Sequence, residues 1–143
     1  MTKLRNKIFE LHDRRSLVDF LDYKQAEPND PLVYVLQEPP QNINILGAAD
    51  FGNLVICLPF NSQIMFSSAP FIFKMQKNLK DFTSSDYILC TGDPAIIGLS
   101  TAIVSNNTIG QFNLLKWDKR ERKYYPLHID CLLYTSDAAD DGL

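Results

Sequence analysis

The sequence lacks the features that mark membrane, secreted and metal-binding proteins. No apolar run approaches the ~18–20 residues that a membrane-spanning helix needs. The basic N-terminus has no apolar segment of the kind found in signal peptides. There are only three cysteines and two histidines, and no CxxC, HxxxH or HExxH spacing. We therefore expect a cytoplasmic protein with no membrane partner, no disulfide framework, no metal site and no cofactor.

Recognisable catalytic motifs are also missing. His12 and His128 do not sit in an identifiable triad. Cys57 and Cys90 each end a hydrophobic run, which favours small buried core residues over nucleophiles. Neither a Walker A loop nor a dinucleotide fingerprint is present. No catalytic residue is assigned, and the sequence leaves open whether the protein is an enzyme.

The C-terminal stretch 131–141 resembles translated transposon mosaic-end DNA, an adapter used in sequencing libraries. We expect residues 131–143 to be a non-native tail without packed contacts, so that the native chain would continue beyond Asp130; a natural acidic tail is the alternative. Without this stretch, 14 acidic residues balance 14 basic ones. Overall charge then gives no attraction to nucleic acid, which leaves a local basic patch as the remaining route.

Hydrophobic spacing predicts a helical N-terminal arm over residues 1–25, followed by an α/β domain over 32–130. Leu4, Ile8 and Leu11 recur at helical spacing, and Ser16 is a candidate cap for a second helical turn. The run 26–31 contains two prolines and reads as a linker. Predicted strands cover 32–36, 53–58, 87–90, 111–117 and 124–130, with a strand-like piece at 63–66; predicted helices cover 69–82 and 94–105.

The order β-β-α-β-α-β-β predicts a single α/β domain with a mixed five-stranded sheet and helices packed on it. The two strand–helix–strand units require parallel neighbours, so we expect the outer strands to be antiparallel additions. Leu114-Leu115 breaks the alternation of its strand, which suggests a bulge, and Pro126 confines the last strand to an edge. The helix 94–105 is apolar nearly all round and is a candidate contact with the arm or with a second copy in a homo-oligomer.

The strand–TGDP–helix turn is the sharpest local pattern. Gly92 permits an unusual backbone conformation, Asp93 suits a helix cap, and Pro94 suits the first helical turn. One interpretation is a well-capped buried helix. The other is a ligand site formed by Thr91, Gly92 and Asp93, because backbone N–H groups at a helix start can hold an anion.

A second candidate surface is the segment 116–125, which contains five basic residues, two acidic residues and three aromatic residues. Basic side chains can neutralise phosphates, and aromatic side chains can stack on exposed bases. A solvated turn with cross-strand aromatic pairs is the alternative. The candidate binding residues are Lys116, Trp117, Lys119, Arg120, Arg122, Lys123 and Tyr124.

Residues 32–130 resemble a family of small uncharacterised proteins from tailed phages, especially marine ones. The resemblance rests on Gly92-Asp93-Pro94, on the LLKWD run 114–118 and on Asp50-Phe51-Gly52. It implies a viral protein in the cytoplasm of a host bacterium. We predict a phage accessory binding protein that engages nucleic acid or a host protein through the 116–125 hairpin. The alternative is a small ligand- or nucleotide-binding protein, or an enzyme, that uses the TGDP loop.

Overall fold

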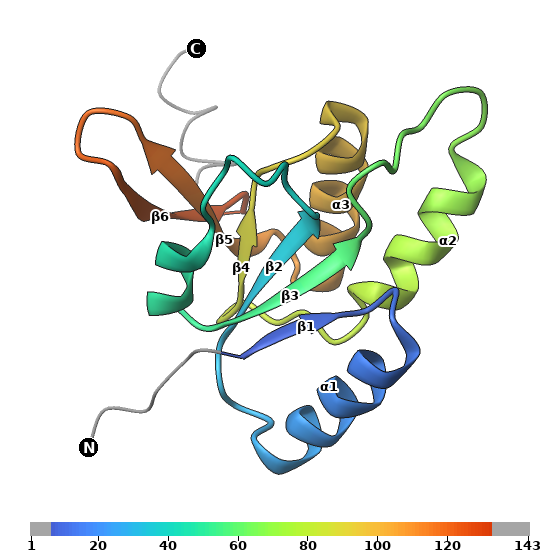
Figure 1. Cartoon of the computed structure of the whole chain (residues 1–143), viewed down its shortest axis with the longest axis horizontal. Helices are drawn as coiled ribbons and strands as arrows, with labels where there is room; N and C mark the ends of the chain where they lie inside the picture. The colour runs from blue at the N-terminus through green and yellow to red at the C-terminus, as the bar shows by residue number, and fades with distance from the viewer. Residues whose placement is uncertain (1–6, 133–143) are drawn as a thin grey trace.

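A six-stranded sheet with the strand order β1-β3-β2-β4-β5-β6 forms the centre of the molecule (Figure 1). The structure is a computed structural model, and it describes residues 7–132. The elements are β1 (Ile8–Glu10), α1 (Arg14–Ala26), β2 (Leu32–Gln37), the short 3-10 helix η1 (Leu46–Asp50), β3 (Asn53–Leu58), α2 (Ala69–Asn78), β4 (Tyr87–Leu89), α3 (Pro94–Asn107), β5 (Gln111–Asp118) and β6 (Lys123–Asp130).

The α/β class and the mixed sheet are confirmed, but the predicted number of strands is wrong. Strands β1, β3, β2, β4 and β5 run parallel, and only β6 is antiparallel. The expectation that both outer strands are antiparallel therefore holds for β6 alone. The strand at 32–36 lies in the middle of the sheet, with a parallel neighbour on each side.

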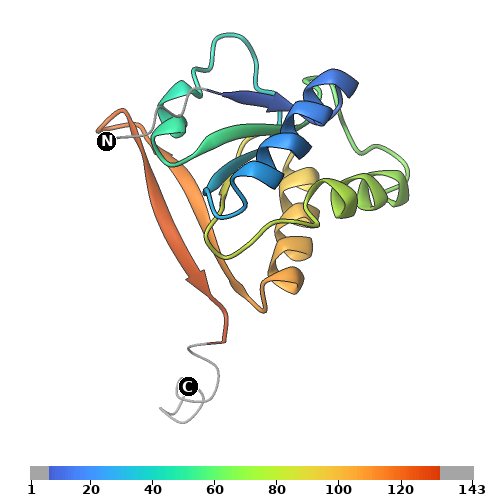
Figure 2. The ribbon, with the colours of Figure 1, turned by 90° about the horizontal axis from the view of Figure 1, so that it is seen from below.

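The two faces of the sheet are covered by different kinds of chain. Helices α1, α2 and α3 lie on one face, and the 38–52 connection with η1 lies on the other (Figure 2). Tyr34 and Leu36 point to the helices, whereas Val33 and Val35 point to the connection. Every residue of β2 and β3 is buried. This explains why both strands read as nearly continuous apolar runs.

The first part of the predicted helical arm, based on the spacing of Leu4, Ile8 and Leu11, is wrong where the structure describes the chain. Ile8–Glu10 forms the edge strand β1, which pairs with Leu54–Ile56 of β3. Helix α1 starts at Arg14 because the Asp13 carboxylate accepts a 3.0 Å hydrogen bond from the Ser16 N–H. Ser16 is therefore not the cap, and its hydroxyl instead accepts from the Glu10 N–H at 2.7 Å.

The β5–β6 hairpin has no bulge, contrary to the prediction at Leu114-Leu115. Its register runs without interruption from Gln111 opposite Asp130 to Asp118 opposite Lys123. Consecutive apolar residues fit here because both faces of β5 meet apolar neighbours. The edge position predicted from Pro126 is confirmed, since β6 is the last strand of the sheet. The strand-like piece at 63–66 belongs to no strand.

Helix α3 is less buried than its composition suggests. Ile96, Ser100 and Val104 face the core, while Ala95, Gly98 and Ala102 are exposed. The helix packs on β2, β5 and α2. Contact of this helix with a second copy stays a prediction.

The expectation that residues 131–143 are a non-native tail without packed contacts stays a prediction, and the two described residues of this stretch are exposed. The Cys131 N–H donates to the Gly110 carbonyl at 2.9 Å and continues the hairpin pairing by one residue. Residues 133–143 lie outside the part of the chain that the structure describes.

Candidate binding cleft beside the hairpin

The turn of the β5–β6 hairpin is held by Asp118. Its carboxylate accepts from the backbone N–H groups of Arg120, at 2.9 Å, and Glu121, at 3.4 Å. Arg122 has a φ of 52°, the left-handed conformation that lets the chain turn back into β6. The Asp118 carboxylate is therefore committed to the turn backbone, and the guanidinium groups of Arg120 and Arg122 extend from an exposed turn.

Trp117 and Tyr124 form an aromatic pair at the base of this turn. They are register partners, with ring centroids 4.9 Å apart and an angle of 63° between the rings. The Tyr124 hydroxyl donates to the Asn44 carbonyl at 3.3 Å, and partial burial raises the pKa of Tyr124. Trp117 remains 44% exposed. Tyr124 thus joins two segments, and its ring packs against the Trp117 ring in an edge-to-face contact.

The predicted hairpin residues do not all share one face. Side chains alternate along a strand, so Trp117 and its partner Tyr124 point to the face of the 38–52 connection. Lys116 and Lys123 occupy alternate positions and point to the helical face. Lys119, Arg120 and Arg122 lie in the turn between the strands. The structure therefore brings together the two aromatic residues and the turn cations, and it separates Lys116 and Lys123 from the aromatic pair.

A cleft of about 480 Å³ opens beside the aromatic pair, between the hairpin and residues 42–45. Its floor is apolar and includes Ile45, Leu89 and Leu115, which belong to the core on this face of the sheet. Cys90 and Thr91 border it at the end of β4. Ligands of open α/β sheets characteristically bind at the carboxyl ends of parallel strands, which is where this cleft lies.

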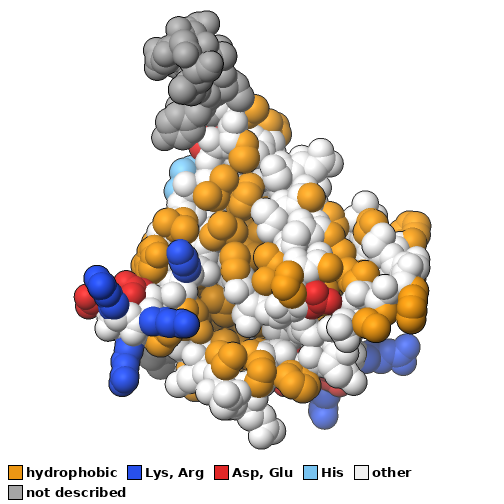
Figure 3. Space-filling model, turned by 90° about the horizontal axis from the view of Figure 1, so that it is seen from above, with side chains coloured by type: hydrophobic (Ala, Val, Ile, Leu, Met, Phe, Trp, Pro, Cys, Tyr) orange, Lys and Arg blue, Asp and Glu red, His pale blue; other side chains and the backbone are white. Residues whose placement is uncertain are grey.

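The surface seen from the carboxyl ends of the strands is largely apolar at its centre (Figure 3). Hydrophobic side chains gather in the middle. One cluster of charged side chains lies at the left, on the side of the hairpin in Figure 1, and further charged side chains lie at the right. Ile43 and Trp117, both lining the cleft, are 46% and 44% exposed. The described residues that line the cleft are therefore uncharged, and the cations of the hairpin turn follow its aromatic pair along the chain.

The TGDP loop is tied into the protein by its own polar groups. Asp93 caps α3, as predicted, and accepts from the Ala95 N–H at 3.0 Å and the Ile64 N–H at 3.2 Å. Its own N–H donates to Gln37 Oε1 at 2.8 Å. Gly92 has a φ of 119°, and a Cβ there would lie 2.6 Å from the same oxygen. These contacts give Gly92 and Asp93 a structural task; a ligand role for them stays a prediction.

Gln37 anchors the TGDP loop, although it was not among the residues predicted from the sequence. It is 6% exposed at the end of β2, and its Nε2 donates to the carbonyls of Phe60, at 2.7 Å, and Ser62, at 2.6 Å. A polar residue closing an otherwise apolar strand was the available sign of this role. Thr91, in contrast, lies at the cleft with Trp117, so the two candidate sites of the sequence meet at this residue.

The two candidate core cysteines differ in position. Cys57 is 1% exposed, and burial raises the pKa of its thiol well above the ordinary value. Cys90 is exposed at the border of the cleft, which contradicts the expectation of a buried residue. Desolvation still raises the pKa of the Cys90 thiol, so it is less reactive at neutral pH than a free cysteine.

The described part of the chain contains no candidate metal site and no helix that could span a membrane. Within residues 7–132, no three His, Cys, Asp or Glu side chains are grouped so that they could hold a metal ion. Over the same range, every helix is too short or too polar to cross a bilayer.

The sequence from β2 through β6 matches a known family of phage proteins. The model of the Phage Pam3 gp32-like protein family matches residues 31–131. The chain belongs to this family. The phage resemblance expected from the GDP and LLKWD motifs is thereby confirmed. The match in the Phage Pam3 gp32-like protein family runs from β2 through β6, so it includes the hairpin, the cleft and the TGDP loop, and it leaves out β1 and α1. No curated protein and no solved structure matched the chain.

Proposed function

We propose that this protein is a phage accessory protein that binds single-stranded nucleic acid in the cytoplasm of the infected host. One unstacked base would enter the cleft against Trp117, and the adjoining phosphates would lie along the hairpin turn. The observation that carries the proposal is the half-exposed Trp117 at the cleft, directly beside a turn with three cationic side chains.

The charges of the turn favour an anionic partner. Lys119, Arg120 and Arg122 are exposed, and the Asp118 carboxylate is already occupied by two backbone N–H groups. Glu121 is the remaining acidic side chain of the turn. Phosphate neutralisation by such side chains releases counterions and supplies most of the sequence-independent affinity for nucleic acid.

The aromatic pair and the cleft favour a single strand over a duplex. Stacking of a base on an aromatic side chain contributes about 1–3 kcal/mol and requires a base that is not already stacked in a helix. The edge-on contact with Tyr124 holds the Trp117 ring in one orientation, which lowers the entropy cost of stacking. A volume of about 480 Å³ also lies within the range of small-ligand sites.

A host protein with an acidic surface is the second candidate partner. Ile43 and Leu46, close to the hairpin, are 46% and 60% exposed. Exposed apolar side chains beside cations are typical of a protein interface as well. A free nucleotide in the cleft, with Thr91 contributing a hydroxyl, is the small-ligand form of the same proposal.

The test is a salt-dependent titration of a fluorescein-labelled oligothymidylate, followed by anisotropy, with fluorescence of the single tryptophan as a second readout. We expect quenching of Trp117 and an affinity that falls as salt rises. The R120E/R122E protein should bind at least tenfold more weakly and lower the salt slope by about 1.4, the value for two lost phosphate contacts on a single strand. Trp117→Ala should cost about 1–3 kcal/mol in binding free energy, measured by anisotropy.

The matched control is R14E/R15E, which makes the same charge change at the exposed start of α1. It should leave both the affinity and the salt slope near the wild-type values. Equal binding by the hairpin variant and the wild type, or an absence of Trp117 quenching with any oligonucleotide, would exclude the nucleic-acid proposal. In that case slower association of R120E/R122E with an acidic host protein would favour the second candidate.

A further inference from the structure

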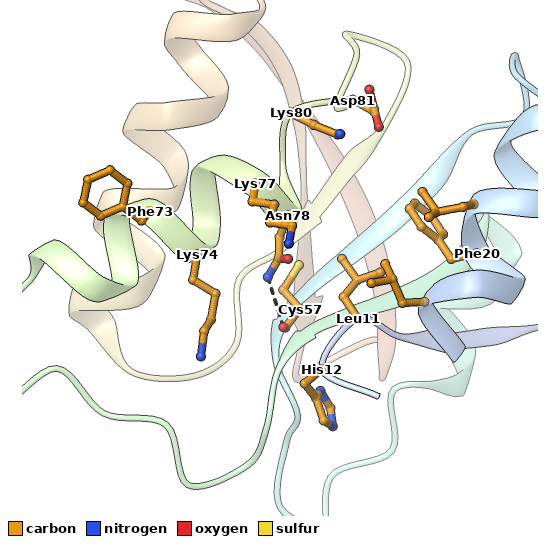
Figure 4. A pocket seen from close by; sticks show the side chains of 12 residues that line it. Leu11, His12, Phe20, Cys57, Phe73, Lys74, Lys77, Asn78, Lys80 and Asp81 are labelled. Carbon is orange, nitrogen blue, oxygen red and sulfur yellow. Dashed lines mark hydrogen bonds between the residues drawn. The ribbon is translucent and has the colours of Figure 1, made fainter. Parts of the chain in front are cut away.

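Helices α1 and α2 leave an open groove between them over the end of β3 (Figure 4). Its volume is about 540 Å³. Asn78 of α2 donates from Nδ2 to the Cys57 carbonyl of β3 at 3.2 Å, which ties the helix to the sheet at the floor of the groove. The groove lies on the helical face, whereas the cleft beside the hairpin lies on the other face.

The walls of the groove near α1 are apolar. Leu11 and Phe20 are buried in the helical-face core, and Leu17 packs against that core. Leu21 and Phe73 line the groove from α1 and α2 yet remain 49% and 73% exposed. Large apolar side chains left in contact with water favour a ligand that covers them, because each square ångström removed from water lowers the free energy.

The side of the groove formed by α2 is cationic. Lys74 and Lys77 lie one turn apart on α2, and Lys80 follows the helix (Figure 4). Asp81 is the one acidic residue among the described residues that line the groove, and His12 lines it as well. Within residues 7–132, none of the three lysine ammonium groups forms an ion pair or a hydrogen bond. Lysines near the end of a helix also favour its dipole, but this accounts for Lys77 alone and not for the apolar hollow beside all three.

We infer that this groove binds a medium-chain amphiphilic carboxylate. The acyl chain would cover Leu17 and Leu21, and the carboxylate would lie against Lys74 and Lys77. An apolar wall facing a surplus of unpaired cations matches a ligand with one apolar and one anionic end. The volume is in the range of sites for small molecules. This site is separate from the proposed nucleic-acid surface and does not depend on it.

The experiment is calorimetric titration of the full chain with dodecanoate below its micelle concentration. We expect saturable binding with one site per chain. K74E/K77E should weaken binding at least tenfold, and Leu21→Glu, at an exposed position that does not threaten folding, should weaken it as well. Dodecyltrimethylammonium, which has a cationic head, should not bind. R120E/R122E, with the same charge change on the distant hairpin, should bind dodecanoate like the wild type.

Three results would overturn the inference. One is the absence of saturable dodecanoate binding to the wild type. Another is equal affinity of wild type and K74E/K77E, which would mean that the lysines do not recognise the head group. The third is binding to anionic phospholipid vesicles without binding to monomeric dodecanoate, which would make the groove a contact for a lipid surface instead of a ligand site.

Discussion

Asp86 is a buried carboxylate that joins the starts of β2 and β4. It is 2% exposed and accepts from the N–H groups of Leu32 and Thr83, both at 2.9 Å, and from the Thr83 hydroxyl at 3.2 Å. Burial raises the pKa of Asp86, although the hydrogen bonds from Thr83 and Leu32 oppose the shift. Its role is structural, and it lies away from the cleft.

Asp86→Asn should lower the free energy of unfolding by about 1–3 kcal/mol, because an amide nitrogen cannot accept from Thr83 and leaves buried donors unpaired. The loss should depend on pH. A raised pKa means that the folded state binds the proton more tightly than the unfolded state. The wild-type advantage over Asn is therefore full below about pH 3.9 and declines as pH rises through the folded pKa.

Urea unfolding of both proteins at several pH values measures this difference. Asp30→Asn makes the same kind of change at a carboxylate that lies on the α1–β2 connection. This variant serves for comparison. A wild-type advantage that grows with pH would show instead that the hydrogen bonds to the ionised carboxylate outweigh its burial.

Helix α3 contains a glycine, Gly98, whose position does not require a glycine. A Cβ at Gly98 would meet nothing within 4 Å, and the residue is exposed in the middle of the helix. Gly98→Ala should raise the free energy of unfolding by about 0.5–1 kcal/mol, because alanine loses less backbone entropy in a helix. Thermal or urea unfolding measures the gain.

Gly92→Ala is the paired test, with the opposite sign. Its φ of 119° and the 2.6 Å approach to Gln37 Oε1 leave no room for a methyl group. This variant should be destabilised by more than Gly98→Ala is stabilised. Stabilisation by both alanines would mean that the loop at residue 92 relaxes freely.

The elements that could be predicted from sequence are those with long, continuous patterns. Strands β2 and β3 and helix α3 were placed within two residues, because apolar runs with a Gly, Pro or Asp at their ends allow few alternatives. Strand β1 has only three residues, and a short apolar pattern does not separate helix from strand. It becomes a strand because β3 offers it an unpaired edge, which is a tertiary effect.

The candidate site was predictable in its parts but not in its assembly. Trp117, Tyr124 and Thr91 were named from two separate patterns, and the cleft joins them only because β4 and β5 are neighbours in the sheet. The separation of Lys116 from Trp117 follows from strand alternation once the bulge is absent. The α1–α2 groove was missed because its two sides are more than 50 residues apart in sequence.

Strand β1 belongs to the central sheet and α1 to the core, although the family match starts only at residue 31. Phe9 of β1 is 5% exposed and packs against Phe20 and Tyr23 of α1, with ring centroids 5.5 Å and 5.4 Å away. This cluster belongs to the same core as β2 and α3. Burying each such aromatic side chain contributes about 1.5–3 kcal/mol.

Deletion of residues 1–26 should therefore abolish the stable monomer. It removes the buried aromatic cluster and uncovers β3 as an edge strand whose residues are all buried in the full chain, and a flat apolar edge promotes aggregation. We expect the shortened chain to elute as aggregate in size-exclusion chromatography and to lack a cooperative thermal transition. Ile8→Thr, at a position 45% exposed on β1, should keep the transition within a few degrees of wild type. A shortened chain that stays monomeric and melts like the wild type would show that β1 and α1 are an attachment to a domain complete from β2 onwards.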